Sequence, residues 1–196
     1  ILLIAFIGIN TVNAFDNTTK VYDYAMVLTT SQKEELKEKV YKYIDEYNMD
    51  MVLVTVKYHE KSTTKDYAQD FYDYNGFGLN DTYDGIIFVI DFNFGYTDIY
   101  IATTGKSILV YDDYRIDNML DNIASEKNNG YYSMFETFIS DASKYANLGI
   151  PSSNSNVTID SNGHPIYKEF TPWITIILVS VLIPTLIILI FVFKNK

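Results

Sequence analysis

The stretch MVLVTVKY at residues 51–58, together with GIIFVID at residues 85–91, decides the fold of this chain. Both runs are rich in β-branched and other apolar residues and lack polar alternation, which is typical of strands buried on both faces. Asn93 and Gly95 supply turn chemistry after the second run, and DIYIATT at residues 98–104 then predicts a third strand. We expect the last two strands to form an antiparallel hairpin.

Helical spacing of apolar residues surrounds these strands. Four segments show it, at residues 31–47, 64–74, 114–123 and 132–148. Ser31 and Glu34 have the spacing of a capping box at the start of the first helix, and Asn48 is expected to end it. The pattern also allows a short first strand near Val21 or Val27. This order predicts an α/β fold in which helices cover both faces of a mixed β-sheet.

The folded region is acidic and has no cysteine. The chain has 196 residues, enough for one ordinary domain and membrane segments. All 25 acidic residues and 13 of the 15 basic ones lie between Asp16 and Glu169, so this region carries a net charge of −12. Such a field repels nucleic acid and attracts cations or basic partners, although solubility alone is the other interpretation. Without cysteine, disulfides and thiolate metal sites are excluded.

The first residues resemble the end of a signal peptide. Residues 1–8 are apolar, and Val12 and Ala14 occupy the −3 and −1 positions of a small-residue cleavage site. We therefore interpret residues 1–14 as a signal-peptide remnant and expect the mature chain to begin at Phe15. A buried N-terminal strand and an uncleaved anchor are the alternatives.

The last residues predict a transmembrane helix. Residues 173–193 contain no charged side chain, and about 20 such residues span a bilayer. Lys194 and Lys196 follow, so residues 194–196 are expected to form a cytoplasmic tail, with the folded domain (residues 15–148) on the extracytoplasmic side. Residues 149–172 are rich in Pro, Ser, Asn and Gly and predict a flexible tether. A buried soluble helix is the alternative for residues 173–193.

The sequence offers little catalytic machinery. The chain has two histidines, and we interpret His59 as a solvated residue at a strand end and His164 as part of the tether. No G-x-S-x-G nucleophile motif or phosphate-binding glycine pattern is present. The glycines at residues 76 and 78 are interpreted as loop residues.

Aspartates at strand ends are the strongest candidates for a site. Hard divalent cations bind several oxygen ligands, and loops at strand ends can supply them. We predict that Asp23, Asp91, Asp112 and Asp113 come together at one edge of the sheet and bind Ca²⁺ or Mg²⁺. Solvated turn residues are the alternative for each of them, and Asp112 and Asp113 could equally cap the helix that follows.

These segments together resemble a known family. VYDYAMVLT at residues 21–29 is similar to the opening V-x-D-x-A-x-x-L-S of the TPM domain, and the strands MVLVTV and DGIIFVI follow in that family's order. IATTG at residues 101–105 resembles its I-E-x-G-x-G-L segment, although the second glycine of that segment is replaced, since Lys106, Ser107 and Ile108 follow Gly105. The likeness covers residues 20–147, and implies a sandwich with helices on both faces of a mixed sheet. It also implies, from other members, calcium- or magnesium-binding loop aspartates, acid phosphatase activity, or accessory and repair roles.

Three functions follow as expectations. The first is a membrane-anchored, extracytoplasmic accessory or quality-control domain that contacts membrane or envelope proteins. The second is a metal-dependent phosphatase, in which Arg115 would bind phosphate beside Asp113, because Arg115 is the one arginine of the acidic region. The third is a surface spacer without a specific partner.

Overall fold

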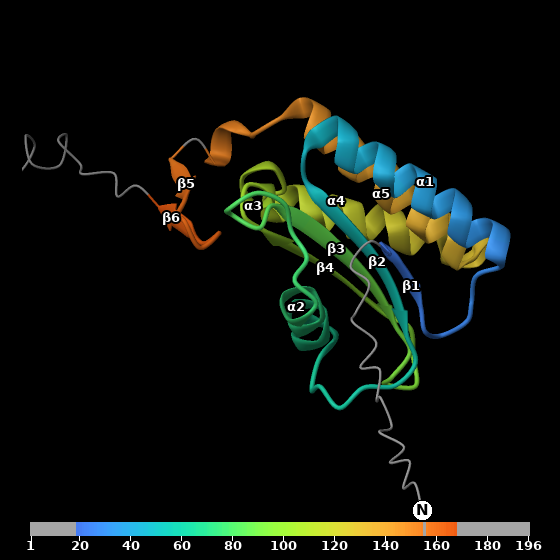
Figure 1. Cartoon of the computed structure of the whole chain (residues 1–196). Coiled ribbons are helices and arrows are strands. Elements are labelled where there is room, and N and C mark those ends of the chain that lie inside the picture. Colours follow the sequence, from blue (N-terminus) through green and yellow to red (C-terminus); the bar gives the residue numbers. More distant parts are fainter. Residues whose placement is uncertain (1–18, 155, 168–196) are drawn as a thin grey trace, which may run out of the picture. The chain divides into compact units, whose positions relative to one another are not determined.

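The computed structural model describes residues 19–154 and 156–167 (Figure 1). The four strands of the main sheet in this part of the chain lie in the order β1 (Val21–Asp23), β2 (Asp50–Val56), β3 (Gly85–Asp91) and β4 (Asp98–Thr104). β1, β2 and β3 are parallel, and β4 is antiparallel to β3. The mixed sheet, its hairpin and the short first strand are therefore confirmed.

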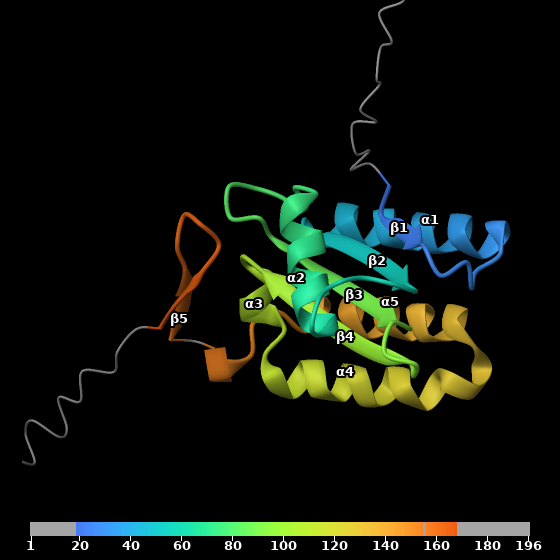
Figure 2. The same cartoon turned by 90° about the horizontal axis from the view of Figure 1, so that it is seen from below.

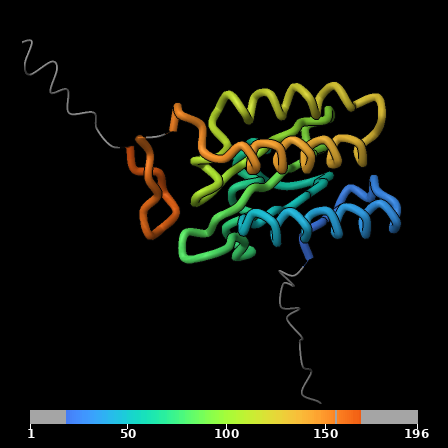
Figure 3. Tube along the Cα trace, turned by 90° about the horizontal axis from the view of Figure 1, so that it is seen from above, coloured from blue at the N-terminus to red at the C-terminus, as the bar shows by residue number. Residues whose placement is uncertain are grey.

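Helices cover both faces of the sheet. α1 (Thr30–Tyr47), α4 (Asp113–Ser125) and α5 (Tyr131–Leu148) lie side by side over one face (Figure 3), and α2 (Thr64–Tyr74) lies over the other (Figures 1 and 2). Two short helical turns, α3 (Ser107–Val110) and η1 (Glu126–Asn129), complete the connections. The α/β class with helices on both faces is confirmed.

β2 and β3 lie at the centre of the sheet, and every residue in both strands is buried. Successive side chains of a strand point to opposite faces, so each strand contributes to two cores. The larger core lies under α1, α4 and α5 and includes Leu53, Phe88 and Phe138, whose ring stacks on Phe88 with the centroids 4.9 Å apart. The smaller core lies under α2 and includes Val54 and Val89.

The first helix begins two residues earlier than the predicted capping box. Thr29 is its N-cap: the hydroxyl accepts a hydrogen bond from the Gln32 amide, and the Gln32 side chain accepts one from the Thr29 amide. The assignment to Ser31 and Glu34 was wrong because Ser31 lies inside the helix, where its hydroxyl donates to Glu35. Asn48 ends the helix in the left-handed conformation, as expected.

The predicted signal-peptide remnant (residues 1–14), transmembrane helix (residues 173–193) and tail (residues 194–196) lie outside the described residues. Among the described residues, no helix has the length and apolar character needed to cross a membrane. The predicted tether is described as far as residue 167 and has regular structure that was not expected. It contains a 3₁₀ turn, η2 (Ser152–Asn154), and a small hairpin of β5 (Val157–Ile159) and β6 (Pro165–Tyr167).

Two tyrosines form a short chain of hydrogen bonds inside the larger core. The Tyr43 and Tyr111 hydroxyl oxygens are 2.6 Å apart, and the Tyr111 hydroxyl donates to the Ala142 carbonyl at 2.9 Å. Since Tyr111 has one proton, Tyr43 must be the donor to Tyr111. Burial raises the pKa of both phenols, because an ionised phenolate loses its hydration there.

This pair predicts a loss of stability in alkali. The folded-state pKa values lie above the unfolded value of about 10, so the stabilisation is complete below about pH 10 and is lost as the pH rises. Each such phenol removes up to about 1.4 kcal/mol per pH unit in that range. Urea unfolding between pH 8 and pH 11 should show a shallower loss in the Tyr43→Phe/Tyr111→Phe double variant than in the wild type. Tyr114→Phe, at an exposed tyrosine, is the control; an unchanged slope in the double variant would contradict the assignment.

Candidate functional site

The most elaborate polar cluster lies where β3 ends. Asp91 is fully buried, and its Oδ2 is 2.7 Å from Nε2 of His59 and accepts a hydrogen bond from the Thr64 hydroxyl at 2.9 Å. Its Oδ1 accepts the Asn93 amide at 2.8 Å. The Thr64 hydroxyl is also 2.6 Å from Oδ2 of Asp98, which lies opposite Asp91 in the sheet. We call Asp91, His59, Thr64 and Asp98 the Asp91 cluster.

His59 is not the solvated residue expected from the sequence. Its side chain is 5% exposed, and its ring stacks on Tyr67 and meets the Phe94 ring edge-on. The Lys61 amide donates to Nδ1 at 3.1 Å, so Nε2 carries the proton and donates it to Asp91. Both ring nitrogens are occupied, which leaves neither free to act as a base in this arrangement.

Asp23 also lies at this edge, but its carboxylate holds the loop between β1 and α1. Oδ1 accepts from the Thr55 hydroxyl at 2.6 Å and from the Val27 amide, while Oδ2 accepts from the Leu28 amide at 3.0 Å. These bonds close a turn that leads into the first helix. The V-x-D pattern of the sequence therefore has a structural role here.

Asp112 and Asp113 lie at the opposite edge of the sheet. β4 is antiparallel to β3, so the chain that follows it has returned to the end where β3 begins. Asp112 is the N-cap of α4, with its carboxylate bound to the Arg115 amide and the Ser153 hydroxyl, and Asp113 is exposed in the first turn. The structure therefore does not bring the four predicted aspartates together at one edge. Across residues 19–154 and 156–167, no three His, Cys, Asp or Glu side chains are arranged to hold a metal ion.

Arg115 does not offer its guanidinium to a phosphate. It is 9% exposed, and Nη1 donates to the carbonyls of Val110 at 2.7 Å and Gly149 at 2.6 Å. The guanidinium also lies over the Tyr145 ring, 5.0 Å from its centroid. Arg115 thus joins the start of α4 to the end of α5, and its Nη1 is bound to backbone carbonyls in this arrangement.

Two more buried carboxylates, those of Asp50 and Asp84, lie at the opposite edge, and the sequence analysis did not single them out as site residues. Asp50 binds the Lys20 ammonium and the Gly78 amide, both at 2.9 Å. Asp84 accepts from the Thr82 hydroxyl at 2.6 Å and from the Lys106 amide at 2.7 Å. Burial alone would raise the pKa of Asp84, but hydrogen bonds from Lys106, Thr82 and Asn80 outweigh it and lower that pKa. The visible signal was an aspartate directly before each buried strand.

Three loops at the edge that holds the Asp91 cluster present exposed apolar side chains. Tyr24 and Met26 belong to the loop after β1, Tyr58 to the loop after β2, and Tyr96 to the loop after β3, with exposed fractions between 48% and 83%. The loops after β2 and β3 contact each other, since the Asn93 side chain accepts the His59 amide at 3.2 Å. We call Tyr24, Met26, Tyr58 and Tyr96 the tyrosine edge.

The comparison with protein families agrees with this architecture. The model of the TPM domain matches residues 21–144. The chain belongs to the TPM domain family. It is 27% identical over 150 residues to the UPF0603 protein YdjH of Bacillus subtilis (strain 168), a match that covers 76% of this chain and 56% of that protein. This TPM chain therefore spans little more than half the length of that relative.

Solved structures share the TPM fold. The N-terminal domain of a protein from P. gingivalis matches with a TM-score of 0.57 at 14% identity, over 69% of this chain and 87% of that domain. The BA42 protein of the psychrophilic bacterium Bizionia argentinensis matches with a TM-score of 0.51 at 14% identity, over 65% and 88%. At these identities the similarity shows the fold alone.

The bonding in this TPM domain predicts that Asp91 matters far more for stability than Asp113. Asp91→Ala should cost roughly 2–4 kcal/mol of unfolding free energy, because the His59 ring and the Asn93 amide lose their acceptor. Asp113→Ala should cost less than about 1 kcal/mol, because only a favourable charge at an exposed helix start is lost. Urea unfolding at pH 7 measures both. Equal costs would show that the Asp91 cluster is not the structural centre of this edge.

Proposed function

We propose that this chain is a membrane-anchored, extracytoplasmic accessory or quality-control domain, which contacts a membrane or envelope protein through the tyrosine edge. The observation that carries the proposal is the exposure of Tyr24, Met26, Tyr58 and Tyr96 on the loops that follow three neighbouring strands. The uncharged segment at residues 173–193 supports anchorage, and the signal-peptide remnant supports export.

The chemistry of the tyrosine edge suits recognition of another protein. Tyrosine brings a large ring and a hydroxyl at low cost in side-chain entropy, and loops rich in Tyr, Ser, Gly and Asn recur in protein-binding surfaces. The loops at residues 24–29 and 92–97 contain no charged residue, although the domain around them is strongly acidic. Exposed apolar groups gathered in one place mark an interaction site more often than isolated ones do.

The site geometry gives the alternatives less support. Arg115 is engaged by backbone carbonyls and His59 has no free ring nitrogen, so the two residues best suited to phosphoryl chemistry are occupied. The calcium or magnesium ion expected from the sequence has no place in this proposal, because the four aspartates do not converge. The third alternative, a spacer without a specific partner, does not explain why the side chains of the tyrosine edge are exposed.

Photocrosslinking tests the proposal. A benzophenone amino acid placed singly at Tyr58 and Tyr96 should capture the same protein in membranes of the source organism, whereas placement at Tyr114 should not. Tyr114 is the matched control, since it is similarly exposed but begins α4 at the other edge of the sheet. Excess unlabelled chain should compete, and its Tyr58→Ser/Tyr96→Ser variant should not. The same yield at all three positions, or background capture by a folded chain, would contradict the proposal.

A further inference from the structure

We propose that the outer edge of β4, with the groove between β4 and α2, binds an extended basic segment of another protein by strand addition. This inference goes beyond the tyrosine edge, because it rests on different residues at a different surface. In strand addition, backbone hydrogen bonds give affinity, and alternate side chains of the added strand enter pockets beside it.

The first observation is an open strand edge. β4 has seven residues and pairs with β3 on one side (Figure 2). On its other side, no backbone hydrogen bond from another described segment reaches it. Natural proteins usually protect such edges with lysine, proline or a bulge. Residues 98–104 (DIYIATT) contain neither lysine nor proline, and every one of them pairs in register with β3. The outer edge is therefore a template for a further strand.

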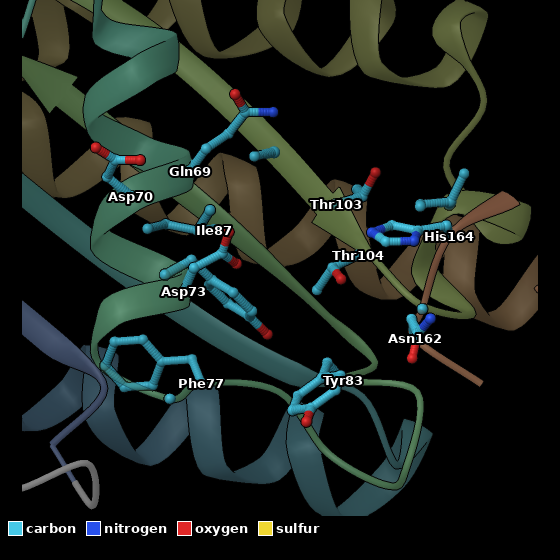
Figure 4. Close-up of a pocket in the computed structure, with 15 residues that line it drawn as sticks. Gln69, Asp70, Asp73, Phe77, Tyr83, Ile87, Thr103, Thr104, Asn162 and His164 are labelled. Atoms are coloured by element: carbon cyan, nitrogen blue, oxygen red, sulfur yellow. The ribbon is translucent and has the colours of Figure 1, made fainter. Parts of the chain in front are cut away.

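The second observation is a groove of about 660 Å³ beside that edge (Figure 4). α2 has 11 residues and ends at Tyr74, and the groove lies between this helix, the last residues of β4 and the turn between β5 and β6. The Gly163 carbonyl in that turn accepts the Gly105 amide at 3.2 Å, so the turn closes the groove just beyond the end of β4. Gln69 and Asp73 line it from the helix, and Thr103 and Thr104 line it from the strand. In Figure 4, Asp73 lies between the helix and the strand that carries these threonines.

The charge of the groove favours a positively charged occupant. Its lining contains two carboxylates, Asp70 and Asp73, and no lysine or arginine among the described residues. Asp70 forms an ion pair with Lys61, whereas Asp73 has no ion-pair partner within the described chain. An added strand that carries lysine or arginine would place a positive charge beside Asp73. A second copy is disfavoured, because this chain carries a net charge of −10 and would bring a second set of the same carboxylates.

The third observation is an unsatisfied buried hydroxyl in the groove wall. Tyr72 is 4% exposed, and its hydroxyl has no hydrogen-bond partner in the part of the chain that the structure describes. The hydroxyl lies over Gly85, where any Cβ would overlap it. A buried polar group without a partner is costly, and native proteins leave few of them. A polar group of an entering segment could supply the missing hydrogen bond.

A binding experiment tests the proposal with the full chain in a mild detergent. The probe is a fluorescein-labelled peptide, Thr-Lys-Val-Thr-Lys-Val-Thr, followed by fluorescence anisotropy. Its Glu-for-Lys analogue, and an analogue with alternate backbone N-methyl groups, should each bind at least about tenfold more weakly, since one lacks the charge and the other the hydrogen bonds. Hydrogen exchange of amides in β4 should slow when the lysine peptide binds.

Protein variants locate the site. Asp73→Asn should weaken the binding of the lysine peptide by about twofold to fivefold, the range for one exposed charge pair at low salt. Asp45→Asn is the matched control, because Asp45 is also an exposed aspartate near a helix end, on α1 over the other face. Tyr72→Phe should leave the fold intact and weaken binding. Tyr58→Ser/Tyr96→Ser should not affect the peptide, so this test and the crosslinking test can fail separately.

Three results would overturn the proposal. The first is equal affinity for the lysine and glutamate peptides or for the N-methylated analogue. The second is equal weakening by Asp73→Asn and Asp45→Asn. The third is a dimer without peptide, detected by light scattering, in which the β4 amides are already protected, because a second copy would then occupy the edge.

Discussion

The burial of two neighbouring strands on both faces is the constraint on which the rest of this structure depends. β2 and β3 have no exposed residue along their seven paired positions, so helices must cover each side of the sheet. Three helices, α1, α4 and α5, cover the face with the larger core, and the single short helix α2 covers the other face. The buried strands also begin or end in carboxylates, Asp50, Asp84 and Asp91, each of which can remain buried because hydrogen bonds satisfy it.

The two ends of the sheet have different chemistry as a result. At one end, Asp50 and Asp84 face Lys20 and Lys106, and their bonds hold loops in place. At the other end, the Asp91 cluster lies beneath loops that expose Tyr24, Tyr58 and Tyr96, and the loop of Tyr58 also exposes Lys57 and Glu60. A rigid polar base beneath exposed aromatic loops is an arrangement in which recognition can vary while the fold is kept. The residues that maintain the sheet in this domain are therefore different from the exposed residues of the tyrosine edge.

The helices and strands could be predicted from the sequence because the residue patterns that indicate each of them lie within one short segment. The apolar runs, the turn at Gly95 and the helical spacing each lie within one segment. The first cap was misplaced because Thr29, Thr30 and Ser31 are all suitable residues, and backbone geometry chose among them. The environment of His59 was missed because its partner Asp91 lies 32 residues away. The aspartates were grouped wrongly because the antiparallel direction of β4 carries the chain back across the sheet.

The Arg115 contacts have a mechanical consequence. The guanidinium extends from the first turn of α4 and donates to the carbonyl of Gly149, which directly follows α5, and to that of Val110, the last residue of α3. A pulling force applied to the chain beyond Gly149 would therefore load this side chain before it could unwind the last turn of α5. The force would then pass into α4 and be shared between two helices. Tension on the chain beyond Gly149 would therefore be resisted by α4 and α5 together.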